Sequence, residues 1–365
     1  MKPQPAVEIL RAAIESGAAP GAVLVVGRSN EITLQVALGH LTYEADAAAV
    51  SPRTVYDLAS LTKVIATTPL AMLLHDRELL DLDSTVSRYV PEFSGEEKDR
   101  VTVRDLLAHC GGLLWWTELY KQFEGQPPAK AKRGYIQAIC DLPLDYPPRA
   151  KTVYSDLGFL LLGEVLERIS GTALDVLAAT ELFAPLGMDE TFYRPPAELL
   201  PRIAPTEYDD WRQRLVHGDV HDENAYGLAG VAPHAGLFST ARSLIPFAKL
   251  ILNEGVHDGQ RLISAEAVRL FAARANLVPG SSRALGWDTP CEGSSAGRLL
   301  SPSAFGHTGF TGTSLWIDPE LDCFALLLTN RVHPTRENSL IGELRPALHD
   351  AVVRSFAGSS TTTRA

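Results

Sequence analysis

Runs of residues typical of β-strands lie near both ends of this chain, whereas the long middle part has a helical pattern. Residues 22–26 and 32–37 are short apolar runs separated by a turn at 28–30, which predicts a β-hairpin. Strand-like runs return at 313–317 and 323–329. The simplest fold brings the two ends together in one α/β domain and inserts a helical domain between them. A ligand site is expected in the crevice between the two parts.

Apolar residues recur at helical spacing in several segments, and these segments define the predicted domains. Helices are predicted at residues 5–17, 61–74, 102–107, 157–169, 243–252, 265–273 and 340–355. Pro69 should kink or break the second of these helices, and Gly171 should cap the fourth. The predicted parts are a sheet domain of residues 1–58 and 225–357, a helical domain of 59–224 that ends in a long loop at 191–224, and a disordered tail at 358–365.

The charge and the cysteines limit the partners and the compartment. The net charge of −11 disfavours nucleic acid or an anionic membrane as a partner, because both bind basic patches. The N-terminus lacks a signal-peptide pattern and no stretch approaches the roughly 20 apolar residues of a membrane span, so a cytoplasmic protein is expected. The four cysteines are predicted to be scattered buried thiols: Cys110, Cys140, Cys291 and Cys323.

The first candidate for chemistry is the segment Ser60-Leu61-Thr62-Lys63, the only Ser-x-x-Lys in the chain. A serine hydroxyl needs a nearby base to become a nucleophile, and a lysine three residues further along a helix lies on the same face. If the Lys63 amine is desolvated in a cleft, its pKa falls and it can accept the hydroxyl proton. Backbone N–H groups at the start of the helix would also favour a developing oxyanion. The alternative is a helix-capping serine beside a surface lysine.

Two further segments could complete such a site. Tyr154-Ser155-Asp156 directly precedes a predicted buried helix, so the Tyr154 phenol could move protons in the crevice. Tyr208 begins a similar pattern, but it lies in the irregular loop. Residues 306–310 (GHTGF) precede a predicted strand, and their glycines would let a substrate backbone approach a strand edge and an N–H complete an oxyanion hole.

In this order along the chain, the three segments resemble the motifs of the serine β-lactamase and penicillin-binding-protein superfamily. The resemblance is closest to the branch with class C β-lactamases, D-alanyl-D-alanine carboxypeptidases and related esterases, including penicillin-binding protein 4B-like hydrolases. It covers roughly residues 20–355 and includes the stretches VTVRDLLAHCGGL, YSDLGFLLLGEVLE, HAGLFSTARSL and FGHTGFTGTSLW. It implies an α+β fold of the β-lactamase/transpeptidase type, in which helices flank an antiparallel sheet and an all-helical domain is inserted.

The resemblance also implies roles for individual residues. Ser60 would be acylated, Lys63 and Tyr154 would share acid–base work, and the N–H groups of Ser60 and Phe310 would form the oxyanion hole. The substrate would be a small ester, amide or β-lactam, with no cofactor. Residues implied to bind it are His307, Thr308, Gly309 and Arg331, with Asp156 where relatives have Asn.

Two departures from the pattern bear on activity. Asp156 cannot donate a hydrogen bond to a substrate carbonyl when it is ionised, and it could instead pair with Lys63 and raise the pKa of the amine. This disfavours an efficient β-lactamase and favours an esterase-like or amidase-like hydrolase. Gly111 stands where relatives often have Ser, and this turn is expected to be structural.

The polar stretch from His217 to His234 allows two other interpretations. His221, Asp222 and Asn224 are candidates either for a substrate-binding loop or for supporting the residues that touch the substrate, because the resembled subgroup has a similar V-H-D-x-N-A stretch. Mixed histidines and carboxylates can bind a metal, so a metallohydrolase centred on His221 and His234 is an alternative, although no metal-binding spacing is present and no metal is expected. A non-catalytic protein that binds a ligand in the same cleft is another alternative.

Overall fold

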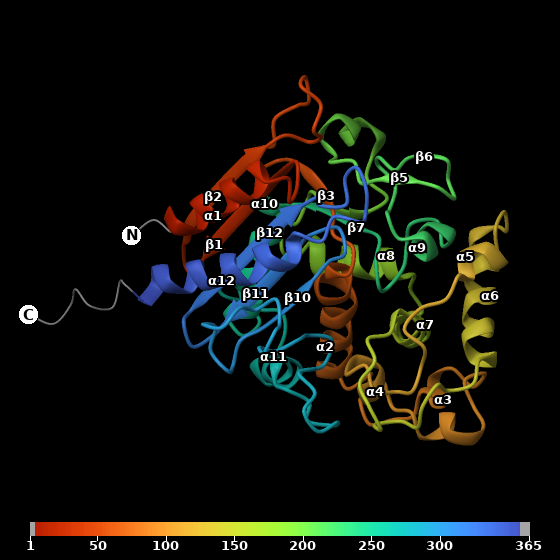
Figure 1. The fold of residues 1–365 in the computed structure, drawn as a ribbon. Coiled ribbons are helices and arrows are strands. Elements are labelled where there is room, and N and C mark those ends of the chain that lie inside the picture. The colour runs from red at the N-terminus through yellow and green to blue at the C-terminus, as the bar shows by residue number, and fades with distance from the viewer. Residues whose placement is uncertain (1–3, 358–365) are drawn as a thin grey trace, which may run out of the picture.

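The predicted strands from the two ends of the chain lie side by side in one sheet. The computed structural model describes residues 4–357. Its largest sheet is antiparallel, with the strand order β10-β11-β12-β1-β2 (Figure 1). These strands are β1 (Gly21–Gly27), β2 (Ile32–Gly39), β10 (Phe305–Thr308), β11 (Ser314–Asp318) and β12 (Cys323–Thr329). The register pairs Leu24 with Leu327, so the predicted hairpin joins the late strands through β1.

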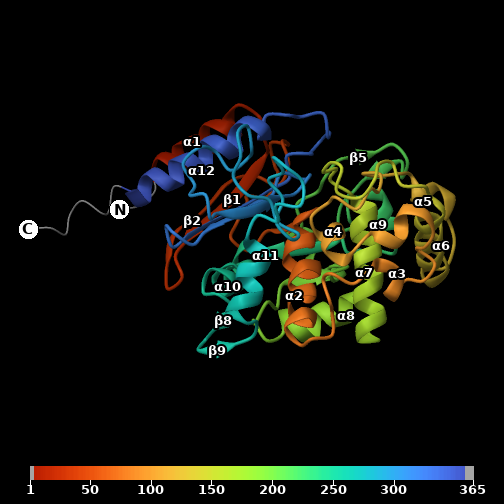
Figure 2. The ribbon, with the colours of Figure 1, turned by 90° about the horizontal axis from the view of Figure 1, so that it is seen from below.

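Helices cover both faces of this sheet. On one face, α1 (Gln4–Glu15) packs beside α12 (Ile341–Ala357) over β1 and β12. On the other face lie α10 (Ala241–Leu252) and α11 (Ala265–Ala272), as Figure 2 shows. Every residue of β1 and β12 is buried, because a strand covered on both faces has no solvent side.

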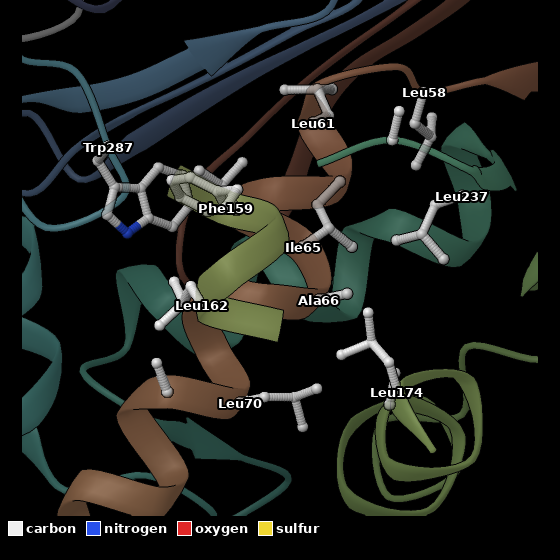
Figure 3. Packing of buried hydrophobic residues seen from close by; sticks show 14 of the residues in the cluster. Leu58, Leu61, Ile65, Ala66, Leu70, Phe159, Leu162, Leu174, Leu237 and Trp287 are labelled. Carbon is white, nitrogen blue, oxygen red and sulfur yellow. The ribbon is translucent and has the colours of Figure 1, made fainter. Parts of the chain in front are cut away.

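The middle of the chain is mainly helical and packs beside the sheet. Its α-helices are α2 (Thr68–Asp76), α3 (Val86–Tyr89), α4 (Val103–Leu107), α5 (Leu119–Gln122), α6 (Pro128–Asp141), α7 (Asp156–Ser170), α8 (Leu174–Ala178) and α9 (Glu223–Gly227). As predicted, α7 ends at Gly171, which adopts a left-handed conformation with φ 65° and caps the helix. Figure 3 shows Leu61, Ile65 and Leu70 in the core beside Phe159 and Leu162 of α7.

Pro69, which the sequence predicts to kink or break the helix, does not end the helical segment. The segment after Ser60 begins with a π-helical turn, η1 (Lys63–Thr67), and continues directly into α2. Pro69 lies in the first turn of α2, where its missing N–H is tolerated best. The segment is irregular directly ahead of Pro69, where the π-helical turn precedes α2.

The predicted long loop at 191–224 contains more regular structure than its sequence indicates. Its first residues form β4 (Thr191–Tyr193), which joins β3 (Val55–Asp57) and β7 (Leu237–Thr240) in a small antiparallel sheet. The same segment also contains β5 (Tyr208–Asp209) and β6 (Arg214–Leu215), and a further two-residue pair, β8 (Val256–His257) with β9 (Gln260–Arg261), lies later in the chain. Strands this short show no alternating pattern, so the sequence could not mark them.

Three of the four cysteines have the burial that the sequence predicts. Cys110, Cys140 and Cys323 are buried free thiols as predicted, but Cys291 is exposed. Within residues 4–357 there is no helix with the length and apolarity that a bilayer crossing requires. The tail predicted to be disordered, 358–365, lies outside the described residues.

Candidate active site

Ser60 is held by a tight turn at the end of β3. The buried Asp57 carboxylate accepts hydrogen bonds from the Ala59 N–H (2.8 Å) and the His221 N–H (2.6 Å). Ala59 has a φ of 46°, a left-handed conformation that a non-glycine residue adopts only when its surroundings impose it. The turn thereby places Ser60 at the start of the buried helical segment, where the sequence predicts it.

Lys63 is completely buried behind Ser60. Its Nζ lies 3.1 Å from the Ser60 Oγ, 3.1 Å from the His234 carbonyl oxygen and 2.7 Å from a carboxylate oxygen of Asp156. Burial alone would lower the pKa of the Lys63 amine, but the charge of Asp156, and then Tyr154, raises it above its ordinary value. The pairing of Asp156 with Lys63 that the sequence suggested is therefore present, and it favours the ammonium form.

Tyr154 is positioned from the start of α7 and by the turn at His109. The Ser155 side chain caps α7, and the Ser155 N–H donates to the His109 Nδ1 at 3.0 Å. The His109 ring lies 4.6 Å from the Tyr154 ring, and Lys63 Nζ lies 4.8 Å from the same ring centroid. Burial raises the pKa of the Tyr154 phenol, although Lys63 lowers it in part, so the phenol stays protonated near neutral pH.

Residues 306–310, which the sequence places just before a strand, begin within the edge strand β10. His307 is buried, its Nδ1 lies 2.8 Å from the Thr308 carbonyl oxygen, and its ring lies 5.8 Å from the Tyr154 ring. Burial, and then the nearby Lys63 charge, lower the pKa of His307 well below its ordinary value. A neutral imidazole thus stands beside the Tyr154 phenol.

Threonines join the end of β10 to the Ser60 turn. The Thr311 hydroxyl donates to the Asp57 carbonyl oxygen at 2.8 Å, and the Thr313 hydroxyl donates to the Leu58 carbonyl oxygen at 3.0 Å. Neither the Ser60 N–H nor the Phe310 N–H donates a hydrogen bond within residues 4–357. Both donors predicted for an oxyanion are therefore available at this junction.

A pocket of about 310 Å³ opens on Ser60, Tyr154, Thr308 and Phe310. Three arginines contribute to its walls: Arg283, Arg331 and Arg345. Sequence reasoning singled out Arg331 and missed the other two, because nothing in the helical pattern around residue 345 or the irregular segment around residue 283 indicates a site. Asp57 and His109, which position Ser60 and Tyr154, were missed for the same reason.

Arg345 is a half-buried cation that has no carboxylate partner within residues 4–357. Its guanidinium donates to the carbonyl oxygens of Gly309 (2.7 Å) and Thr313 (2.8 Å), and it forms no ion pair within residues 4–357. Burial, and then the nearby charge of Arg331, lower the pKa of Arg345 to about 9. Because a charge that is largely shielded from water is costly when unpaired, an anionic ligand would suit this pocket.

The structure does not place Asn224 or His221 on the walls of the Ser60 pocket. The Asn224 amide is fully buried, where it accepts from the Tyr120 N–H and donates to the Thr117 carbonyl oxygen, so its polar atoms hold the backbone. His221 pairs with Glu207 at 2.8 Å and stacks on the Phe310 ring. The predicted substrate contacts of these two residues are therefore replaced by supporting roles.

His221 and His234, the centre of the alternative metal site, do not belong to one group of possible metal ligands within residues 4–357. His234 pairs with Asp222 at 2.9 Å, whereas His221 pairs with Glu207. A different group, Asp156, Asp222 and His234, has ligand atoms within 4.8 Å of one another. The Lys63 ammonium already supplies a positive charge to Asp156 there.

Comparisons with known proteins agree with this geometry. Residues 7–347 match the sequence profile of the family described as Beta-lactamase. The chain belongs to the beta-lactamase family. It is 34% identical to an N-acetylmuramyl-L-alanine amidase of Bacillus subtilis over 86% of this chain and 78% of the relative. It is 32% identical to a protein of Salmonella gallinarum named "Putative D-alanyl-D-alanine carboxypeptidase", over 93% of this chain and 87% of the relative.

Solved structures show that the fold is also that of the beta-lactamase family. A penicillin-binding protein homologue from Caulobacter crescentus superposes with a TM-score of 0.77, covering 97% of each chain at 21% sequence identity. The expected α+β fold with an antiparallel sheet is thereby confirmed. The protein is a serine hydrolase of the beta-lactamase family, as the resemblance of its three motifs implied.

Gly309 offers a test of how closely β10 and the Ser60 turn must approach. A Cβ at this position would lie 2.1 Å from the Thr313 Oγ1 and 2.5 Å from the Leu58 carbonyl oxygen. We expect Gly309→Ala to lower the free energy of unfolding by about 1–3 kcal/mol and to lower kcat more than tenfold, because the strand must move away from the turn. Thermal unfolding and ester hydrolysis measure the two effects. Gly342→Ala, at a position with open space, is the matched control; equal behaviour of the two variants would contradict the close contact.

Proposed function

We propose that this protein is an acyl-enzyme hydrolase whose substrate is a peptide-like amide or ester with a carboxylate near the scissile bond. The observation that carries the proposal is the unpaired, half-buried Arg345, which lines the same pocket as Ser60 in a protein whose net charge is −11. The names of the related amidase and carboxypeptidase support an amide substrate from this class. An anionic end group would supply the missing counter-charge.

Arg331 and Arg283 give the pocket further positive charge. Arg331 spans the turn after β10, because its guanidinium donates to the carbonyl oxygens of Phe310 (2.8 Å) and Arg336 (2.7 Å). Burial lowers the pKa of Arg331, with the nearby charge of Arg336 acting in the same direction. Arg283 lies 5.3 Å from the Tyr154 ring centroid and 3.9 Å from its carboxylate neighbour Asp288.

The proposed chemistry begins at the Ser60 hydroxyl. In the fraction of molecules whose Lys63 amine is neutral, the Ser60 Oγ forms a bond to the substrate carbonyl carbon as its proton passes to that amine, 3.1 Å away. The N–H groups of Ser60 and Phe310 stabilise the oxyanion of the tetrahedral intermediate. When the intermediate collapses, the bond to the leaving amine or alcohol breaks, and that group takes the proton that Lys63 holds, by way of the Tyr154 phenol.

The second half of the reaction uses the same groups in reverse. Water adds to the Ser60 ester and transfers its proton to Lys63 through Tyr154, and the acid product leaves as the Ser60 Oγ is protonated again. The neutral His307 ring beside Tyr154 keeps a second positive charge away from Lys63. We assign Thr308 and Gly309 to backbone contacts with the substrate along the edge of β10.

The carboxylate assignment is tested with a matched pair of substrates. We expect the enzyme to hydrolyse a peptide that ends in D-alanyl-D-alanine faster than the same peptide with a C-terminal amide. Arg345→Ala should reduce kcat/KM for the acid by about 10–100-fold and leave the amide nearly unchanged, because a charge-assisted hydrogen bond is lost only with the acid.

A control variant separates the loss of the carboxylate contact from a general loss of activity. Arg269→Ala removes an exposed arginine of α11 that pairs with Glu254, so its preference for the acid should match that of the wild type. If Arg345→Ala reduces the rates of the acid and the amide equally, the residue acts only by holding Gly309 and Thr313, and the carboxylate assignment is wrong. If the wild-type enzyme hydrolyses the acid no faster than the amide, the carboxylate assignment is also wrong.

We also propose a cytoplasmic location. The four cysteines are unpaired in the structure, and the Cys291 thiol is exposed. Free exposed thiols persist in reducing compartments and are unusual in oxidising ones.

A further inference from the structure

We propose that a second cavity, lined by Tyr120, Trp211 and Tyr226, binds a short uncharged oligosaccharide. The cavity has a volume of about 680 Å³ and does not include Ser60 or any other residue of the Ser60 pocket. Binding there is independent of the acyl-enzyme chemistry. The assignment of the bound sugar as a part of the substrate rests on the proposed function.

A row of aromatic side chains leads into this cavity. The ring of Trp115 lies 5.7 Å from that of Trp116, which lies 6.3 Å from Tyr120. Tyr120 lies 4.5 Å from Trp211, and Trp211 lies 5.9 Å from Tyr226. Trp115 is 59% exposed, and Trp116, Trp211 and Tyr226 are half-buried, so rings on both sides of the buried Tyr120 are accessible to a ligand. Large rings this exposed are costly unless something covers them.

The row begins at the Ser60 site. The Trp115 carbonyl oxygen accepts a hydrogen bond from the Asp156 N–H at 2.9 Å. A further cavity of about 510 Å³ is lined by Tyr120 and Trp211 together with Arg336, and the Arg336 guanidinium lies 5.9 Å from the Phe310 ring. Phe310 in turn lines the Ser60 pocket. The three cavities therefore follow one another along the same surface.

The arginines around the aromatic cavity are paired with carboxylates, whereas Arg331 and Arg345 of the Ser60 pocket form no ion pair within residues 4–357. Arg212 pairs with Asp209 at 2.8 Å, and Arg214 pairs with Asp219. Glu124 adds a negative charge to the same walls. An anionic ligand finds no unpaired cation here, and a fatty chain would have to cover charged groups, so both fit poorly.

An uncharged sugar matches both features of the cavity. A pyranose ring whose substituents are all equatorial has apolar faces that stack on aromatic rings, while its hydroxyls reach sideways to polar partners. Arg214 and Asp219 offer donors and acceptors of this kind beside Trp211. β-Linked N-acetylglucosamine has such a ring, and its acetamido group adds one donor and one acceptor.

The test is calorimetric titration of the full-length Ser60→Ala protein with the N-acetylglucosamine tetramer. We expect saturable binding with a dissociation constant on the order of 1 mM or tighter. Trp211→Leu in the same background should weaken binding about tenfold or more, because it keeps an apolar side chain but removes the ring face. Tyr43→Ala removes an exposed aromatic residue outside this row and should leave binding unchanged.

Several outcomes would overturn the assignment. These are an absence of saturable binding, equal binding by the Trp211→Leu protein, and Trp211-dependent binding of octanoate or phosphate in place of the sugar. Circular dichroism checks that each variant is folded, and Tyr226→Leu serves as a second ring variant if Trp211→Leu is not. The proposed function fails separately, since it depends on hydrolysis by the protein with Ser60 intact and on the acid preference set by Arg345.

Discussion

Ser60→Ala is expected to reduce kcat for every substrate of this protein by about 10³-fold or more. The Ser60 hydroxyl lies within hydrogen-bonding distance of the buried Lys63 amine, 3.1 Å away, and Ser60 lines the pocket. Its removal leaves no atom that can form the covalent intermediate. Residual binding and oxyanion stabilisation are the sources of any remaining rate.

The measurement has a kinetic and a covalent readout. Turnover of a chromogenic short-chain ester gives kcat, and intact mass after treatment with a fluorophosphonate or a penicillin gives the acylation of Ser60. The wild-type protein should gain one adduct, and the Ser60→Ala protein should gain none. Ser16→Ala, which removes an exposed hydroxyl at the end of α1, is the matched control. Turnover retained by the Ser60→Ala protein, or an adduct on another residue, would show that the nucleophile is elsewhere.

The strands that have long apolar runs were predictable from the sequence, and the short ones were not. β1 and β12 are seven residues each and fully buried, so their apolar runs stand out from the surroundings. β3 and β4 have three residues each, and their pairing with β7 depends on contacts far away in the sequence. The division into a sheet domain and an inserted helical domain stays a prediction, because one core cluster contains residues from both parts.

In the candidate site, too, some residues could be predicted from the sequence and others could not. Ser60, Lys63 and Tyr154 could be singled out because their chemistry and order match a known pattern, and the structure brings them together. Arg345 could not, since its role depends on where α12 crosses the end of β10, and its spacing on the helix is that of any surface arginine. Asn224 lies in a stretch that resembles the family's, but its buried amide forms hydrogen bonds with the backbone of Tyr120 and Thr117. A buried amide can stabilise a loop or bind a substrate, and the sequence does not distinguish these roles.

Asp156→Asn is expected to make the enzyme active at lower pH. Asp156 lies 2.7 Å from the Lys63 Nζ, and its charge offsets the effect of burial and raises the pKa of Lys63. Without that charge, burial dominates and the pKa of Lys63 falls, so more of the amine is neutral and able to accept the Ser60 proton at a given pH. The rising limb of kcat/KM therefore moves to lower pH, and kcat/KM at pH 6 should increase about tenfold or more.

The same substitution should speed acylation by β-lactams. An asparagine amide can donate to a substrate carbonyl, whereas the Asp156 carboxylate cannot. The change therefore improves both the base and the contact that the β-lactam side chain would use. Penicillin adduct formation followed by mass over time gives the acylation rate, which should rise in Asp156→Asn relative to the wild type.

The pH profile also separates two roles of Asp156. Ester hydrolysis measured from pH 5 to 10 compares the wild type, Asp156→Asn and Asp83→Asn, the last of which removes an exposed carboxylate that pairs with Arg104. Asp83→Asn should leave the profile in place. If Asp156→Asn instead loses activity at every pH with its rising limb unmoved, Asp156 itself receives the proton from Lys63 during acylation. In that case the Lys63–Asp156 pair, and not the lysine alone, is the base that activates Ser60.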